Sequence, residues 1–236
     1  MSRWLSLLAV LLLIPAVAQA DSMTWSFDAY GPDMHFLIPG KDVHTYLGVF
    51  HINIDFTNPS TPDWSFLAFC VDVQHYVGNS RNVAINDMAN WQQPYTNPYD
   101  FPDYAGAGSY VAYMINTVGM PDTLMKRAAM QLAVWEVLYE DKDLNNFNVS
   151  TGQARVLSGV SSDVITQANQ YVSLVNGLTG IPDAHAPWIQ TLDDNASNYQ
   201  DFTTPVPEPS TLLLLGTGLL AGGLAIRRRT SGKRNG

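Results

Sequence analysis

Two side chains in this sequence have the chemistry to react with each other. Cys70 is the only thiol in the chain. Gln131 lies among apolar residues that recur every three or four positions, so its carboxamide faces the buried side of a predicted helix. Since an unpaired buried amide costs about 1–3 kcal/mol, Gln131 needs a partner. That partner is either a backbone group or the thiol of Cys70, bonded covalently.

The pair has the residue types that an internal thioester requires. A thiolate is both a good nucleophile and a good leaving group, and a thioester survives only where water is kept away. Phe69 and Trp135 can supply aromatic walls for such a site. A hydrogen-bond donor must also stabilise the oxyanion that forms when the carboxamide carbon is attacked.

The residues around the pair resemble the two motifs of Cys-Gln thioester domains in bacterial surface adhesins. The thiol motif is Phe69-Cys70-Val71, and the carboxamide motif is Met130-Gln131-Leu132-Ala133-Val134-Trp135. The resemblance covers about residues 66 to 139 and implies that the thiol displaces ammonia from the carboxamide. It also implies a surface protein that couples once, covalently, to an amine or hydroxyl on a partner. The family often has Thr before the Gln, where this chain has Met130.

Two alternatives use the same residues. In the first, Cys70 is simply a small buried hydrophobic residue, and Gln131 is hydrogen-bonded to a strand edge. A cysteine hydrolase would need a histidine beside Cys70, and His75 lies on the opposite face of the same predicted strand. The other histidines have no recognisable Cys-His context; they are His35, His44, His51 and His185. We therefore expect no catalytic residues of a turnover enzyme and no cofactor.

Two further segments carry other signals. Asp141-Lys142-Asp143-Leu144-Asn145 begins like a calcium loop, but Asn146 and Gly152 replace its Gly and bidentate Glu, so we expect a solvated helix end and no metal ligands. Three prolines among aromatic residues between positions 90 and 103 predict an ordered loop. Its rings either line a sugar-binding groove or pack on the domain; they are Trp91, Tyr95, Tyr99, Phe101 and Tyr104.

A long hairpin and a helix are expected to position Cys70 and Gln131. Residues 24–29 and 44–56 alternate with period two, and residues 64–77 resume as a strand that pairs with 44–56 after a turn. Gln131 lies on the helix predicted from Leu124 to Tyr139, with Asp122 as its N-cap. Shorter helices are expected at 105–117 and 161–177, and a closing hairpin at 186–203. This order predicts an α+β domain, an antiparallel sheet or sandwich with an inserted helical subdomain.

Both ends of the chain have the pattern of processing signals. Arg3, an apolar run and Ala18-Gln19-Ala20 predict a signal peptide over residues 1–20. Near the other end, Val206-Pro207-Glu208-Pro209 precedes an apolar run and then Arg227-Arg228-Arg229, which indicates a C-terminal membrane helix with a basic stop. The predicted segments are thus 1–20, one thioester-like extracellular domain over 21–204, a sorting and anchor segment over 205–229 and a cytoplasmic basic tail over 230–236.

This C-terminal segment resembles the PEP-CTERM sorting signal of Gram-negative bacteria. The similarity lies in the Val-Pro-Glu-Pro at 206–209, the short Gly- and Leu-rich run and the basic cluster. It implies recognition by an exosortase in the inner membrane, removal of the segment near the Pro-Glu-Pro, and delivery to the cell surface or the exopolysaccharide matrix.

The charge of the domain argues against one class of partner. Residues 21–205 contain six Lys and Arg against twenty Asp and Glu, so phosphates would be repelled and we expect no nucleic-acid binding. Two functions are left. One is a covalent adhesin with a thioester between Cys70 and Gln131. The other is a non-covalent matrix component that binds exopolysaccharide or a surface protein through its aromatic, acidic face.

Overall fold

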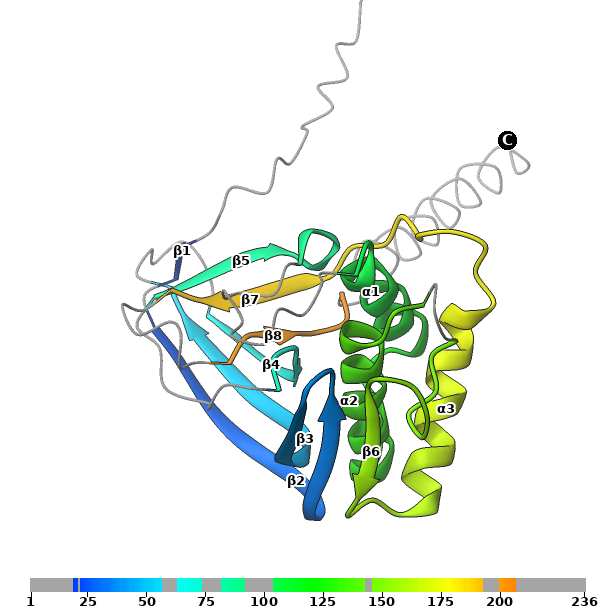
Figure 1. Ribbon diagram of the computed structural model, residues 1–236. Coiled ribbons are helices and arrows are strands. Elements are labelled where there is room, and N and C mark those ends of the chain that lie inside the picture. The colour runs from blue at the N-terminus through cyan, green and yellow to red at the C-terminus, as the bar shows by residue number, and fades with distance from the viewer. Residues whose placement is uncertain are drawn as a thin grey trace, which may run out of the picture.

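The protein is an antiparallel sheet packed against three helices. The computed structural model describes residues 19–20, 22–56, 63–73, 82–91, 104–142, 146–192 and 200–206. Within these residues eight strands follow the order β1-β5-β7-β8-β4-β3-β2-β6, and the three α-helices come between β5 and β7 in the chain (Figure 1). The predicted α+β class is confirmed.

The predicted segments at the chain ends lie almost wholly outside the described residues. This holds for the signal peptide, apart from Gln19 and Ala20, and for the membrane helix from Thr211 to Ile226. Among the described residues, no helix combines the length and apolar character that a bilayer span needs.

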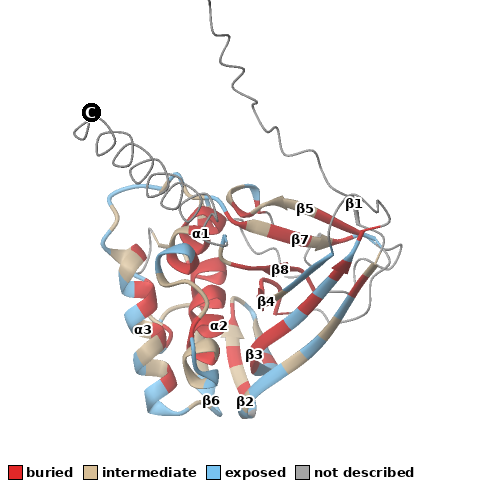
Figure 2. Cartoon of the chain, turned by 180° about the vertical axis from the view of Figure 1, so that it is seen from behind, coloured by how far each residue is buried: buried red, intermediate tan, exposed pale blue. Residues whose placement is uncertain are grey.

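A long curved hairpin forms one side of the sheet. β2 (Ser22–Ile38) and β3 (Lys41–Asp55) pair from Ser22↔Asp55 to Ile38↔Lys41, with a register shift between Tyr30 and Met34. Pro39 and Gly40 make the two-residue turn, and Gly40 has a φ of 80°, which glycine adopts without a steric penalty. In β3 the predicted period of two is confirmed by alternating buried and exposed residues from His51 onward (Figure 2).

The strand that carries Cys70 lies in the middle of the sheet. β4 (Trp64–Cys70) pairs with β3 as predicted, but it ends at Cys70 rather than at Val77. Its other edge pairs with β8 (Phe202–Thr203), which pairs with β7 (Pro187–Thr191), so the predicted closing hairpin forms. The remaining strands were not predicted; they are β1 (Gln19–Ala20), β5 (Val83–Asp87), followed by the 3₁₀ turn Met88–Asn90, and β6 (Arg155–Ser158).

The three helices form close to the predicted positions. α1 (Ala107–Val118) is capped by Gly119, and α3 (Ser162–Asn176) runs between the caps Ser161 and Gly177. α2 (Leu124–Tyr139) has the predicted bounds, but its N-cap is Thr123, whose hydroxyl accepts from the Lys126 N–H. Asp122, the expected cap, instead forms an exposed ion pair with the Lys126 ammonium at 2.9 Å.

The helix that carries Gln131 is buried on every side. All residues of α2 from Ala128 to Tyr139 are buried, because the helix lies between the sheet and the helices α1 and α3 (Figures 1 and 2). The prediction of one buried side is therefore too narrow. Leu124, the first residue of the helix, is 38% exposed, since it lies in the first turn at the edge of the core.

Two carboxyl groups at the C-terminal end of α2, those of Glu136 and of the C-cap Glu140, hold the segment that leads into β6. Glu136 accepts from the Asn148 N–H at 2.6 Å, and Glu140 accepts from the N–H groups of Gln153 and Ala154. Burial raises the pKa of Glu136 to about 9, and the neighbouring Glu140 adds to the shift, so Glu136 is protonated at neutral pH. Its second oxygen, Oε2, has no hydrogen-bond partner among the described residues.

The raised pKa of Glu136 predicts that stability falls as pH rises. Above about pH 4.5 the unfolded chain releases this proton while the folded protein keeps it, so the free energy of unfolding drops by at most about 1.4 kcal/mol per pH unit towards pH 9. The variant Glu136→Gln keeps the acceptor for Asn148 and does not titrate. We expect it to match the wild type near pH 4.5 and to be more stable at pH 8, measured by urea unfolding.

Asp163→Asn, an exposed change on α3, is the control and should leave the pH profile unchanged. Burial raises the pKa of Asp201 to about 7. This group is present in every variant, so it adds the same pH dependence to each free energy of unfolding. If the free energy of unfolding changed with pH in the same way in the wild type and in Glu136→Gln, the raised pKa of Glu136 would be contradicted.

Candidate functional site

Cys70 and Gln131 are in contact. The main-chain N–H of Cys70 donates to Gln131 Oε1 at 2.8 Å, and Gln131 Nε2 donates to the Cys70 carbonyl oxygen at 2.7 Å. Both residues are 1% exposed. The carboxamide thus has a backbone partner at each end, which is the arrangement that the strand-edge alternative expects. It also lies against the residue that carries the thiol, which is what the thioester requires.

The topology of the sheet makes the backbone of Cys70 available to Gln131. The Val71 N–H donates to the Asp201 carbonyl oxygen, so Val71 faces the edge of β4 that pairs with β8. Backbone groups alternate between the two edges of a strand, which turns those of Cys70 toward the β3 edge. The last pair between β4 and β3 is Ala68↔Phe50. Cys70 is the next residue of β4 whose backbone faces this edge, and it is hydrogen-bonded by the side chain of Gln131 instead of by a residue of β3.

The thiol of Cys70 is held against its own chain. Sγ donates to the Asp72 carbonyl oxygen at 2.7 Å and lies 3.3 Å from the Asp72 N–H. Burial, followed by the nearby charge of Asp72, raises the pKa of the Cys70 thiol well above its ordinary value. The group is therefore a protonated, weakly nucleophilic thiol in this arrangement.

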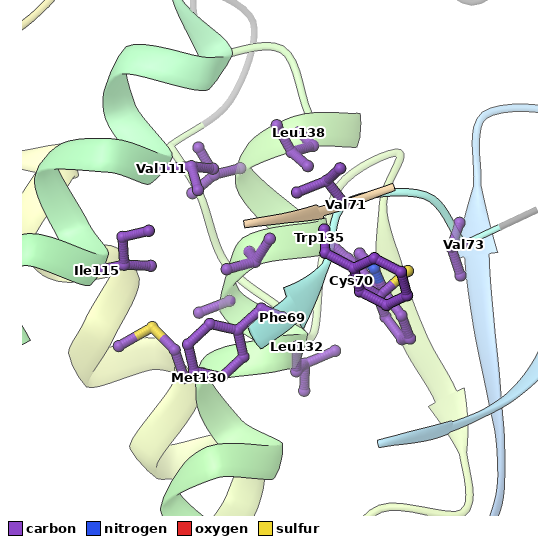
Figure 3. Packing of buried hydrophobic residues seen from close by; sticks show 14 of the residues in the cluster. Phe69, Cys70, Val71, Val73, Val111, Ile115, Met130, Leu132, Trp135 and Leu138 are labelled. Carbon is purple, nitrogen blue, oxygen red and sulfur yellow. The ribbon is translucent and has the colours of Figure 1, made fainter. Parts of the chain in front are cut away.

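A cleft of about 560 Å³ reaches both side chains. Its buried end includes Cys70, Gln131, Trp135 and Gln200, and its exposed end is formed by residues 41–46 of β3. Trp135 lies beside the Cys70 sulfur (Figure 3), and its indole N–H slightly favours the thiolate, opposing the rise in the pKa of Cys70.

Two polar atoms of residues at the buried end have no hydrogen-bond partner in the part of the chain that the structure describes. They are Trp135 Nε1, a donor, and Gln200 Oε1, an acceptor. Buried polar groups in folded proteins are almost always paired. The cleft therefore brings together a thiol, a carboxamide, an indole N–H that is close to the thiol without a hydrogen bond of ordinary geometry, and an amide oxygen without a partner among the described residues.

Gln200 was not identified from the sequence. Its Nε2 donates at 2.8 Å to the Asp72 carbonyl oxygen, which also accepts from the Cys70 thiol. Gln200 lies just before β8, and no local pattern links it to Cys70 across the intervening residues. Only the pairing of β4 with β8 brings it to the site.

The predicted pocket residues occupy two different environments. Trp135 lines the cleft, whereas Phe69 and Val71 are fully buried in the core beside it (Figure 3). Ala133 is also fully buried and does not line the cleft. Phe69 and Val71 flank Cys70 in the chain, so their side chains point to the other face of β4. Besides Trp135, the Trp, Tyr and Phe side chains that line the cleft are those of Trp25, Phe27, Tyr46 and Phe50.

The structure also describes some of the residues on which the cysteine hydrolase and the calcium loop would depend. No histidine among the described residues hydrogen-bonds the Cys70 thiol, although His44 lines the exposed end of the cleft; His75 lies outside these residues. Lys142 donates to the carbonyl groups of Val175 and Leu178, so the start of the calcium-like segment caps the end of α3. Residues 143–145 of that segment lie outside the described residues.

The aromatic loop is described only at its two ends. Trp91 is buried and Tyr104 is half-buried, so these two rings pack on the domain. Tyr95, Tyr99 and Phe101 lie outside the described residues.

Residues 205–229 match the PEP-CTERM protein-sorting motif. The resemblance that rests on Val206-Pro207-Glu208-Pro209 and the arginines at 227–229 is thereby confirmed. The motif implies an exported protein that an exosortase processes, with a membrane-anchored precursor that then reaches the surface.

No curated protein sequence matches the chain significantly. Two similar solved structures are thioester domains of bacterial surface proteins. One is the N-terminal thioester domain of the fibronectin-binding protein SfbI from Streptococcus pyogenes, with 11% identity, a TM-score of 0.35, and coverage of 77% of this chain and 100% of that chain. The other is the N-terminal thioester domain of a surface protein from Clostridium perfringens, with 15% identity, a TM-score of 0.35, and coverage of 78% and 98%.

The two hydrogen bonds of Gln131 predict a large loss of stability when its carboxamide is removed. Gln131→Met leaves the N–H and the carbonyl of Cys70 buried without a partner, which should lower the free energy of unfolding by roughly 2–5 kcal/mol. The comparison is made in a Cys70→Ala background, which keeps both backbone groups and rules out any covalent bond. Urea unfolding followed by tryptophan fluorescence measures the change.

Gln170→Met, an exposed change on α3, is the matched control and should stay within about 0.5 kcal/mol of its parent. Equal effects of the two substitutions would show that the Gln131 hydrogen bonds add no net stability.

Proposed function

We propose that this protein is a covalent surface adhesin whose reactive group is a thioester between Cys70 Sγ and the side-chain carbonyl carbon of Gln131. One observation carries the proposal: a buried carboxamide is hydrogen-bonded at both ends to the residue that bears the only thiol. The cleft of about 560 Å³ gives a partner molecule a route to this pair.

The hydrogen bonds of Gln131 support the step that forms the bond. Donation from the Cys70 N–H to Oε1 polarises the carboxamide carbonyl and would stabilise the oxyanion of a tetrahedral intermediate. Rotation about the Cα–Cβ bond of Cys70 would take the thiol from the Asp72 carbonyl to the carboxamide carbon. The S–C bond then forms, the C–N bond breaks, and the nitrogen leaves as ammonia with the thiol proton.

The two unpaired atoms support the coupling step. An amine entering the cleft attacks the thioester carbonyl carbon; the C–S bond breaks, the sulfur takes up a proton from the amine, and an amide links the partner to residue 131. Trp135 Nε1 would donate to the oxyanion, and Gln200 Oε1 would accept from the attacking N–H. The regenerated thiol would return to the Asp72 carbonyl.

The destination proposed for the protein is the outer surface or exopolysaccharide matrix of a Gram-negative cell. The sorting motif at 205–229 supports export and processing by an exosortase. The partner that carries the amine or hydroxyl would be a surface protein or a matrix polysaccharide, and a biofilm is the setting in which such coupling would act.

A second function is a non-covalent matrix component with a structural cysteine. It is supported by the pairing of both groups without any covalent bond, since the thiol donates to Asp72 and the carboxamide is satisfied by the Cys70 backbone. In that case the cleft would bind its ligand reversibly.

Intact mass separates the two functions. The purified exported protein, kept in mild detergent, should be lighter than its sequence mass by one ammonia, and methylamine should add one methylamine and release one titratable thiol. Cys70→Ala should have its full sequence mass and take up no methylamine. Wild-type protein at full mass with one thiol before any treatment would establish the structural cysteine instead.

The role of the Trp135 indole gives a kinetic prediction. Trp135→Phe keeps an aromatic ring and removes the N–H, so the methylamine reaction should slow by about 10²–10³-fold, as on loss of an oxyanion donor. Trp91→Phe is the matched control, because Trp91 Nε1 is also buried without a partner among the described residues, yet Trp91 does not line this cleft. Equal rates for the two variants would exclude the proposed donor.

A further inference from the structure

Three metal-ligating side chains gather on the outer face of the β2–β3 hairpin near its turn. One ligand atom from each of His35, Asp42 and His44 can be chosen so that all three lie within 4.8 Å of one another. His35 Nδ1 is 3.2 Å from Asp42 Oδ2, and the two imidazole rings have centroids 3.6 Å apart. The group is not part of the Cys70 and Gln131 pair.

The strand register brings these residues together. His35 and His44 are directly opposite each other in the ladder, and Asp42, which pairs with Leu37, is their diagonal neighbour on the same face. Phe36 and Val43 alternate with them and are buried, which fixes the face on which the ligands lie. The two-residue turn at Pro39–Gly40 holds this register.

The donor set selects a class of ion. Two imidazole nitrogens and one carboxylate oxygen suit Zn²⁺ and related divalent transition metals, whereas Mg²⁺ and Ca²⁺ prefer oxygen ligands throughout. Around a tetrahedral Zn²⁺ with bonds of about 2.0–2.1 Å, ligand atoms lie about 3.4 Å apart, so these exposed or half-buried side chains need only small rotations. Three protein ligands leave a fourth position for water or another ligand.

The position of the group relates it to the cleft. Asp42 and His44 line the exposed end of the cleft whose buried end holds Cys70. A cation there would add positive charge beside an acidic domain and would fix the hairpin end at the entrance. Neither effect depends on whether a thioester forms.

We propose that His35, Asp42 and His44 form a binding site for one divalent transition-metal ion of the Zn²⁺ class. Three protein ligands leave a fourth position that water or another ligand can occupy and exchange. The hairpin provides all three ligands, so the ion binds to a preformed site without rearrangement of the sheet.

Isothermal titration of the purified, chelator-treated full-length protein in mild detergent with ZnCl₂ tests the proposal. The wild type should bind one equivalent, and His44→Ala and Asp42→Asn should each bind more than about tenfold more weakly. Co²⁺ in place of Zn²⁺ should give the visible absorption of a four-coordinate site in the wild type only. Zn²⁺ should raise the unfolding temperature of the wild type and not that of His44→Ala.

His51→Ala is the matched control. His51 is an exposed histidine on the same hairpin, with Nε2 3.6 Å from Asp28 Oδ2, and its partner in the ladder is Ser26, whereas His35 and His44 face each other. It should bind Zn²⁺ like the wild type. The proposal would be wrong if His44→Ala bound Zn²⁺ with wild-type affinity, or if His51→Ala lost as much Zn²⁺ affinity as His44→Ala. Circular dichroism without metal establishes that each variant is folded, and an unfolded His44→Ala would be replaced by His35→Gln.

Discussion

Two hydrogen bonds between the Gln131 carboxamide and the backbone of Cys70 join the central strand of the sheet to the central helix. At Cys70 the ladder with β3 has ended, and an N–H and a carbonyl group would otherwise be buried without partners. α2 supplies the missing partner from a side chain. Eight residues further along, the Tyr139 hydroxyl contacts the backbone of Val71 and Val73, so the same helix holds the chain after β4 as well. The position of α2, and with it the packing of α1 and α3, depends on this junction.

The same junction sets the chemical state of the site. Burial keeps the Cys70 thiol protonated, and its hydrogen bond to the Asp72 carbonyl turns it back on its own chain. The carboxamide is polarised by the Cys70 N–H but is fully paired. A thioester would replace these two satisfied groups by one reactive bond, and such a bond would last only where few water molecules reach it.

The parts of the fold that depend on local pattern could be predicted from the sequence. The period-two residues of β3 and the bounds of α2 are of this kind, because alternation and three-and-four spacing lie within one segment. Burial around the whole of α2 could not be predicted, since α2 has apolar residues on several sides and only α3 and the sheet decide which are covered. β6 lacks a recognisable pattern because it is a short edge strand whose register depends on β2. Gln200 and the group at His35, Asp42 and His44 depend on strand pairings between distant or opposed residues, which no single-segment pattern contains.

Unpaired buried atoms bear on whether the cleft is a reactive site or only a packing defect. Among the described residues four buried side-chain atoms lack partners, and each costs about 1–3 kcal/mol relative to a paired group. Trp91 and Glu136 do not line the cleft, so an unpaired atom alone does not identify a site. Trp135 Nε1 and Gln200 Oε1 differ because they line the same cleft and have opposite hydrogen-bonding character. An amine that attacks a carbonyl is oriented by a hydrogen-bond acceptor for its N–H, and its developing oxyanion is stabilised by a hydrogen-bond donor. What distinguishes Trp135 and Gln200 from the other two residues is therefore their place in the cleft that reaches Cys70, where a ligand that enters can complete both hydrogen bonds.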